Sequence, residues 1–192
     1  MLFHFKMGIG PWYEYNRRNV DNDLQNMLYT IKDNYIIWLQ YKIIHRILGV
    51  KKYLLTLGIS DTSLCCFCNS CEETLVHLFY DCIETKKLWA NVKTWLRIKL
   101  NFNLAFTRDM VILGYIYPGE GNVPFNTILL ISKSYIFWCS RHRRLPNIFD
   151  LQKRIETSYF EQKYIATKNN SINKFNKIWE NWTILFNDVQ DQ

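Results

Sequence analysis

Apolar residues recur every three or four positions along most of the chain, which is the spacing of one face of an α-helix. The longest stripe covers residues 24–47 and predicts a long amphipathic helix that ends at Gly49. A shorter helix is expected over residues 51–57, ending at Gly58. The same spacing continues through residues 88–96, 128–138, 151–159 and 172–186. The pattern therefore predicts a mainly α fold.

Polar and turn-forming residues mark where these helices begin and end. Asn126 and Ser171 precede two of the stripes, and we expect their side chains to cap helices. Residues 118–122, with the sequence Pro-Gly-Glu-Gly-Asn, predict the clearest loop of the chain. Four tryptophans fall on the apolar stripes, and we expect them to pack in the core rather than to stack on bases: Trp38, Trp95, Trp138 and Trp179.

The composition is that of an ordinary folded protein. Of the 192 residues 48% are hydrophobic, with only 7 glycines and 4 prolines, which argues against disorder and against turn-rich β architectures. The two most apolar stretches are interrupted by Lys42 and Lys133 and are too short to span a membrane. Because no signal peptide is recognisable either, we expect an intracellular protein of the nucleus or cytoplasm. Clustered cysteines bind metal more often than they form disulfides in such a compartment.

Basic residues gather on both sides of an acidic segment. The formal net charge is +7, and residues 37–60 and 85–100 are basic without any acid, whereas residues 61–84 carry only acids. A polyanionic partner, RNA or DNA, suits this pattern, while solvated helix faces are the alternative explanation for any single stretch. The residues expected to contact nucleic acid are Lys42, Arg46, Lys51, Lys52, Lys86, Lys87, Lys93 and Arg97.

A further basic cluster, Arg141-His142-Arg143-Arg144, stands before Pro146 at the end of a predicted helix. It has two interpretations. It could bind phosphate, or it could be the cationic end of a helix that complements the helix dipole without any partner. The second interpretation is favoured because it needs no ligand.

Cysteines and one histidine form the most informative motif. Cys65, Cys68, His77 and Cys82 follow the pattern C-x2-C-x8-H-x4-C. Three thiolates and one imidazole complete a tetrahedral shell around Zn²⁺ and leave no position for a catalytic water, so the expected cofactor is one structural zinc ion. Five residues span about 140° of an α-helix, so His77 and Cys82 cannot share a face, and we expect Cys82 where the helix ends or bends.

The spacing also allows a second set of ligands. Cys68 and Cys71 form another C-x2-C pair, which gives the alternative set Cys68, Cys71, His77 and Cys82. The spacing alone does not choose between the two, and Cys66 is not a ligand in either.

Several segments around this motif carry a family resemblance. They are Trp38 to Gly49, Leu57 to Asp61, Cys-x-Phe-Cys, Glu-Glu-Thr-x-x-His-Leu-Phe-x-x-Cys and Leu88-Trp89. Together they closely resemble the zinc-binding domain of reverse transcriptases from LINE-type, non-LTR retrotransposons. More loosely, residues 135–139 and 164–166 resemble the C-terminal tail of such polyproteins. The resemblance implies that Cys65, Cys68, His77 and Cys82 are the ligands, and that His45 is a packing or surface residue.

The resemblance also implies a domain organisation and a function. It divides the chain into an N-terminal helical segment (1–37), a zinc-binding domain (38–97) and a helical C-terminal region (98–192). In the family such a domain follows the polymerase and holds RNA template or target DNA. The alternative is a structural module that docks on the polymerase domain of a reverse transcriptase. The Tyr-x-Asp-Asp polymerase motif is absent, and Asp109, Glu120 and Asp150 are too scattered for a nuclease, so we do not expect an enzyme.

Overall fold

The computed structural model describes residue 31 and residues 33–101, 105–114 and 122–186. Within these ranges the regular structure is helical apart from an isolated antiparallel bridge between Leu64 and Glu72, which confirms the mainly α fold. The helices in chain order are α2 (Asn34–Ile44), α3 (Lys51–Thr56), the π-helical turn η2 (His77–Asp81), α4 (Ile83–Leu100), α5 (Arg108–Leu113), α6 (Asn122–Arg141), α7 (Ile148–Lys168), α8 (Ile172–Trp179) and the 3-10 helix η3 (Glu180–Leu185).

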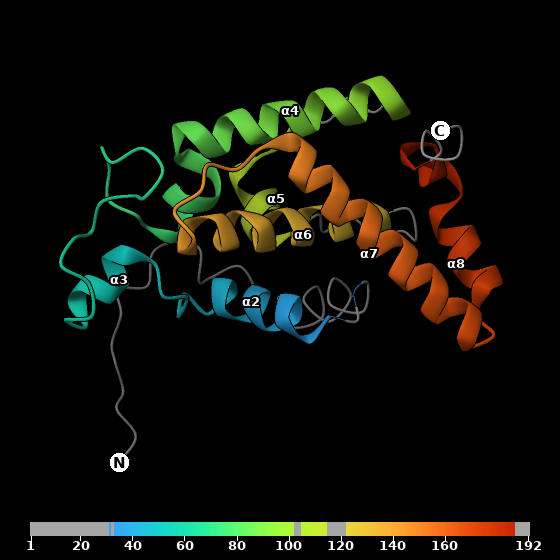
Figure 1. Cartoon of the computed structure of the whole chain (residues 1–192), viewed down its shortest axis with the longest axis horizontal. Coiled ribbons are helices and arrows are strands. Elements are labelled where there is room, and N and C mark those ends of the chain that lie inside the picture. Colours follow the sequence, from blue (N-terminus) through green and yellow to red (C-terminus); the bar gives the residue numbers. More distant parts are fainter. Residues whose placement is uncertain (1–30, 32, 102–104, 115–121, 187–192) are drawn as a thin grey trace, which may run out of the picture.

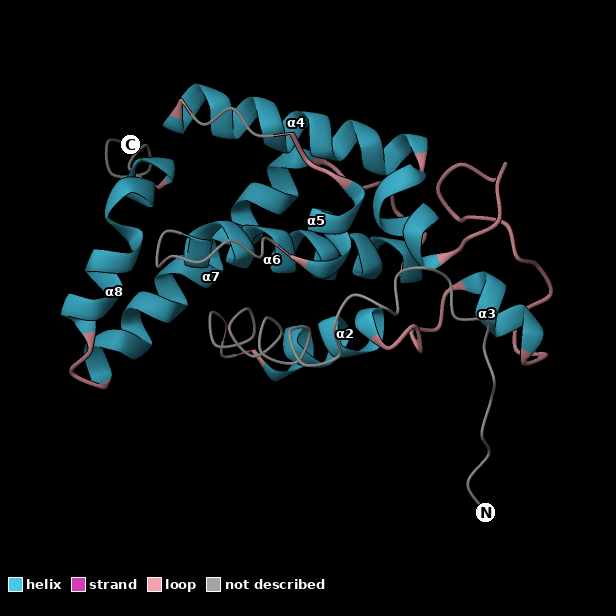
Figure 2. Cartoon of the chain, turned by 180° about the vertical axis from the view of Figure 1, so that it is seen from behind, coloured by secondary structure: helices cyan, strands magenta, loops and turns pink. Residues whose placement is uncertain are grey.

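Helix α6 lies at the centre of the molecule. Helices α4 and α2 lie on opposite sides of it, and α7 crosses it obliquely (Figure 1). The view from behind shows the same layers, with α3 and the cysteine segment at one end and α8 at the other (Figure 2). The buried side chains between Ile31 and Phe186 form one connected hydrophobic cluster. The domain boundaries after residues 37 and 97 stay predictions, and α4 continues past the second of them to Leu100.

The sequence of α6 explains its central place. Residues 124–133 are all buried, so this part of the helix is surrounded by protein on every side, and most of its side chains are apolar. The hydroxyls of Thr127 and Ser132 donate to carbonyls one turn earlier, at 2.9 and 2.7 Å, so these polar groups are satisfied within the helix itself. Across the described part of the chain, no helix combines the length and the apolar character needed to cross a membrane.

Two of the expected helix boundaries are wrong. Asn126 is not a cap, because α6 already begins at Asn122 and Asn126 lies buried inside it. The first helix ends at Ile44 rather than at Gly49, because Arg46 adopts a left-handed backbone with φ of 56°. The third expected boundary is right, because Ser171 occupies the N-cap position of α8. Its hydroxyl, however, donates to the carbonyl of Ala166 at 3.2 Å and makes no capping hydrogen bond.

Other predicted elements agree with the structure or lie beyond it. Helix α3 occupies the segment where a helix was expected over residues 51–57. The start of α2 has a cap of its own, since the Asp33 carboxylate accepts from the backbone N–H of Tyr35 at 2.8 Å. The part of the long stripe before residue 31, and the expected loop up to residue 121, lie outside the described residues.

The four tryptophans do not all reach the core. Trp179 is buried, and Trp95 and Trp138 are partly buried against the core. Trp38 is 56% exposed, so the expectation of core packing is wrong for this residue. The inner face of α2 is aliphatic through Ile36, Leu39 and Ile43, and Trp38 lies on its outer face.

Candidate metal centre

The first half of the predicted zinc motif lies on a tight hairpin between α3 and η2. The backbone N–H of Glu73 donates to the carbonyl of Ser63 at 2.7 Å, and that of Cys65 donates to the carbonyl of Cys71 at 2.8 Å. Asn69 closes the turn with φ of 50°, a conformation that asparagine tolerates better than most residues. The N–H of Phe67 points at Cys65 Sγ at 3.4 Å. The hairpin thereby holds the Cys65 and Cys68 side chains at one end.

The second half of the motif is the π-helical turn η2. Thr74 prepares it, because its Oγ1 accepts from the N–H of His77 at 3.0 Å. The N–H of Cys82 then bonds to the carbonyl of His77 at 2.8 Å, five residues back, and Cys82 continues in extended conformation. A π turn is wider than an α turn and is frequent at functional sites. It brings His77 and Cys82 to the two ends of one turn, and the prediction that Cys82 lies where the helix ends is confirmed.

Two side chains of α4 stabilise the π-helical turn η2 by hydrogen bonds to its carbonyl groups. The Thr85 hydroxyl donates to the carbonyl of Leu78 at 2.8 Å, and Trp89 Nε1 donates to the carbonyl of Phe79 at 2.7 Å. Both carbonyls would otherwise be short of a partner in the interior, because Leu78 and Phe79 are fully buried. The wide turn is thus fixed by α4, whose N-cap is Cys82 itself.

The two halves bring Cys65, Cys68, His77 and Cys82 together. Their ligand atoms all lie within 4.8 Å of one another. The Sγ atoms of Cys65 and Cys82 are 3.8 Å apart, and Cys68 Sγ is 3.4 Å from His77 Nε2. Tetrahedral zinc with the usual bond lengths requires edges of about 3.8 Å between two sulfurs and about 3.6 Å between sulfur and nitrogen. The donor set therefore fits one zinc ion in both chemistry and size.

The electrostatics of the cluster also suit a cation. Hydrogen bonds from the thiols of Cys66 and Cys82 lower the pKa of Cys65. The same contacts with Cys65, together with burial, raise the pKa of Cys66 and of Cys82. Cys65, which is fully buried, is thus the thiol of this group whose ionisation is most favoured. A metal ion that displaces the remaining protons removes the repulsion that keeps the other thiols protonated.

Cys71, the member of the alternative set, lies elsewhere. Its side chain is exposed and is not part of the cluster. Its contribution to the hairpin is the backbone carbonyl that pairs with the N–H of Cys65. Of the two sets that the spacing allows, the structure brings together the one that contains Cys65.

Glu73 is a residue of this region whose importance the sequence did not reveal. It is 1% exposed, and its carboxylate accepts from the N–H of Lys51 at 3.0 Å and from that of Cys66 at 3.3 Å. Arg141 Nη2, from the end of α6, lies 3.7 Å from the same carboxylate and donates to the carbonyl of Gly49 at 2.7 Å. Cys65, Cys66 and Glu73 also bring their possible ligand atoms together, but this group has only three members, and each Glu73 oxygen accepts a backbone N–H. Glu73 joins the hairpin, α3 and α6 rather than holding a metal.

We expect Glu73→Ala to lower the free energy of unfolding by about 3 kcal/mol, because two partly buried N–H groups and the Arg141 guanidinium lose their acceptor. The matched control is Glu72→Ala. Its exposed carboxylate pairs with exposed Lys52 at 2.6 Å, and such a surface pair contributes at most about 1 kcal/mol. Urea denaturation of both variants in the presence of zinc measures the difference. Equal effects of the two substitutions would contradict the role given to Glu73.

Comparison with protein families agrees with this geometry. Residues 12–89 match the family model described as zinc-binding in reverse transcriptase. This part of the chain is similar to the zinc-binding domain of reverse transcriptases. The match spans the hairpin, η2 and the start of α4, which together hold all four residues of the cluster. No curated protein matches the chain.

The basic residues expected to contact nucleic acid fall into two groups around this domain. Lys42 and Arg46 lie at the end of α2, and Lys51 and Lys52 on α3. The other group, all on α4, comprises Lys86, Lys87, Lys93 and Arg97. Helices α2 and α4, which carry part of each group, lie on opposite sides of α6 (Figure 1).

The cluster at the end of α6 makes contacts within the protein. Arg141 binds Gly49 and Glu73 as described, the guanidinium of Arg144 lies over the Trp138 ring at 5.8 Å, and the His142 ring stacks on Trp138 at 4.2 Å. His45 is exposed and packs on the Tyr41 ring at 4.1 Å, away from the four clustered ligand residues.

Proposed function

We propose that this domain is a non-catalytic module that binds nucleic acid and folds around one zinc ion held by Cys65, Cys68, His77 and Cys82. Bound there, zinc supplies no chemistry beyond cross-linking the hairpin to η2. Because Cys82 is both the last member of the cluster and the N-cap of α4, the ion would fix where α4 begins. Binding of nucleic acid would then depend on the exposed side chains of α4.

The observation that carries the proposal is a row of cations along α4. Lys86, Lys93 and Arg97 are spaced by seven and four residues, which places them on one stripe of the helix. At 1.5 Å per residue they follow one another at intervals of about 10 and about 6 Å along the axis. Within the described part of the chain, these three side chains form no salt bridge. A row of unpaired cations without acids suits the phosphates of a nucleic acid strand.

Some of the basic residues predicted to contact nucleic acid already interact with other side chains of the protein. Lys87 is bound to Glu84 at 2.8 Å on its own helix, and Lys52 is bound to Glu72 on the hairpin. Lys42 lies over the ring of Trp38, 3.3 Å from its centre. We therefore place the main contact surface on α4. By the resemblance to LINE-type reverse transcriptases, its ligand is RNA template or target DNA.

Affinity for nucleic acid should fall steeply with salt, because each phosphate contact releases counterions. Replacing Lys86, Lys93 or Arg97 by Ala should weaken binding and reduce the slope of log K against log salt concentration by about 1 for each cation removed. Lys87→Ala on the same helix is the control and should leave the slope nearly unchanged. Fluorescence anisotropy with labelled RNA and DNA measures all four variants. Binding that does not depend on salt would reject the proposal.

A second candidate function is docking on the polymerase domain of a reverse transcriptase. It is favoured by the outer face of α2, where Tyr35, Trp38 and Tyr41 are 49%, 56% and 47% exposed. Aromatic side chains of this size are enriched in protein interfaces. Trp38→Ala separates the two functions. Under the second one it should weaken binding to the polymerase domain and leave the salt-dependent titration unchanged.

A further inference from the structure

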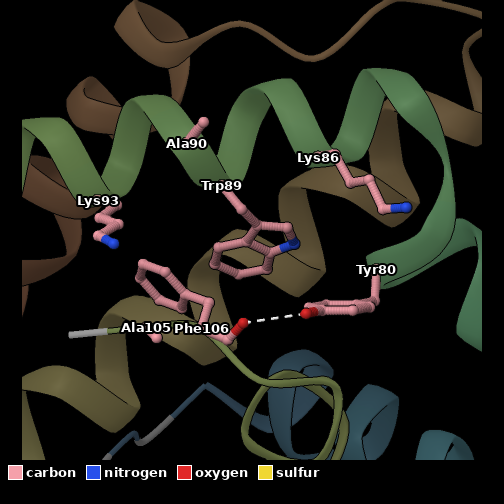
Figure 3. A pocket seen from close by; sticks show the side chains of 7 residues that line it. All are labelled: Tyr80, Lys86, Trp89, Ala90, Lys93, Ala105 and Phe106. Carbon is pink, nitrogen blue, oxygen red and sulfur yellow. Dashed lines mark hydrogen bonds between the residues drawn. The ribbon is translucent and has the colours of Figure 1, made fainter.

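A cleft of about 310 Å³ opens beside the cationic row of α4 (Figure 3). Its walls come from three elements that are far apart in sequence: Tyr80 at the end of η2, Trp89 on α4, and Phe106 in the segment before α5. The volume lies at the lower end of the range for small-molecule sites, so the cleft has room for one planar group rather than for a larger ligand.

The aromatic walls are held in place by contacts among themselves. The rings of Trp89 and Phe106 have their centres 5.0 Å apart, and the Tyr80 hydroxyl donates to the backbone carbonyl of Phe106 at 3.1 Å. Trp89 is fixed in addition by its bond to the carbonyl of Phe79. These contacts fix the three side chains in place. Trp89 is only 4% exposed and forms the floor, so the partly exposed rings of Tyr80 and Phe106 offer the surface on which a flat group can stack.

Two lysines flank this surface. Figure 3 shows Lys86 and Lys93 on either side of the Trp89 indole, with Lys93 on the side of Phe106 and Lys86 on the side of Tyr80, and both line the cleft. They are two helical turns apart, and Ala90, between them on α4, also lines the cleft with its small side chain. The nearby acid Asp81 is bound to Arg108 at 3.2 Å, so it does not neutralise either lysine.

We propose that this cleft receives one unpaired nucleotide of the bound strand. The base stacks on the aromatic walls, and the phosphates on its two sides contact Lys86 and Lys93. This inference rests on the proposed function and makes it more specific, because a base that is paired in a duplex cannot leave its stack without a cost in free energy. The domain then prefers single strands, and it selects them by stacking rather than by reading sequence.

Filling the opening tests the inference without changing any charge. Ala90→Leu in the full-length zinc-loaded chain keeps a good helix former at an exposed position and enlarges a side chain that lines the cleft. The control is Asn91→Leu, the next residue of α4, which is exposed and does not line the cleft. The probes are single-stranded oligouridine and an RNA duplex of the same length.

Ala90→Leu should weaken oligouridine binding about tenfold, which corresponds to the loss of one stacked base. Duplex binding should not change, and Asn91→Leu should bind both probes as the parent chain does. Photocrosslinking of oligouridine that carries 5-iodouridine should label the peptides that contain Tyr80, Trp89 or Phe106.

Three results would overturn the inference. Equal losses for single strand and duplex would mean that Leu at position 90 disturbs phosphate contacts only. An unchanged affinity for oligouridine, with its salt dependence intact, would remove the cleft but leave the proposed function standing. If neither probe binds the parent chain, the proposed function itself fails and the inference fails with it.

Discussion

Replacing Cys65 or Cys68 by Ser is expected to abolish zinc binding, whereas Cys71→Ser retains one zinc ion per chain. Both spacings in the sequence are compatible with a tetrahedral site. In the folded chain, however, the Cys65 sulfur lies 3.8 Å from that of Cys82, and Cys71 is exposed outside the cluster. Removal of Cys65 takes away a ligand, but removal of the Cys71 thiol leaves its backbone carbonyl and the hairpin intact.

The consequences for stability should be large, since structural zinc contributes on the order of 10–16 kcal/mol of binding free energy in small zinc-finger peptides. In this chain the helical core also stabilises the fold, so loss of zinc should not unfold the whole protein. It should lower the melting temperature, and the hairpin and η2 should unfold first. Zinc content by mass spectrometry and hydrogen exchange of residues 63–82 measure the two effects. Metal retained by Cys65→Ser and lost by Cys71→Ser would move the site to the other ligand set.

The sequence predicted the helices well where a stripe of apolar residues meets a core on one side. The segments that became α3, α4, α7 and α8 are of this kind. It failed where the helix is apolar all round. The α6 segment gives no one-sided pattern before residue 128, so the polar Asn126 looked like a cap although it is buried within the helix. The prediction that Trp38 packs in the core failed for a related reason. Both faces of α2 carry apolar residues, and the spacing alone does not tell which face is buried.

For the metal centre, the spacing gave the residue types but not the choice between Cys65 and Cys71. That choice depends on the hairpin register, which is set by the bond between Cys65 N–H and the Cys71 carbonyl. Glu73 was not predicted because nothing local distinguishes it from Glu72. Its burial depends on Arg141, 68 positions further along the chain. The aromatic cleft was missed for the same reason, as Tyr80, Trp89 and Phe106 meet only in the folded structure.

Lys133 is the most unusual residue of the core. The sequence drew attention to it only as an interruption of an apolar stretch, yet it is fully buried in α6. Its ammonium group donates to Gln40 Oε1 of α2 and to the carbonyl of Ile112 in α5 at 3.3 Å. Gln40 Nε2 donates to the same carbonyl at 3.0 Å. Burial without a carboxylate partner lowers the pKa of Lys133 to about 7.

This pKa makes the stability of the fold depend on pH in a predictable direction. Between about pH 7 and 10 the unfolded chain keeps a proton on this lysine that the folded chain has released, so the free energy of unfolding rises with pH by up to roughly 1.4 kcal/mol per unit. Below pH 7 both states are protonated, and the folded state bears the full cost of a buried charge. Lys133→Met removes this dependence, although it also leaves Gln40 Oε1 without its donor, a loss that is the same at every pH.

The difference in stability between Lys133→Met and the parent chain should therefore change by about 3 kcal/mol from pH 7 to pH 9.5, in favour of the parent chain as pH rises. Taking this difference cancels the titration of every group common to both proteins, the zinc ligands included, provided that zinc is saturating. Lys174→Met, at an exposed position of α8, is the control and should show no such change. Denaturation with urea at a series of pH values measures all three proteins. If the two Met variants gave parallel curves, Lys133 would have to be charged in the folded state throughout this range.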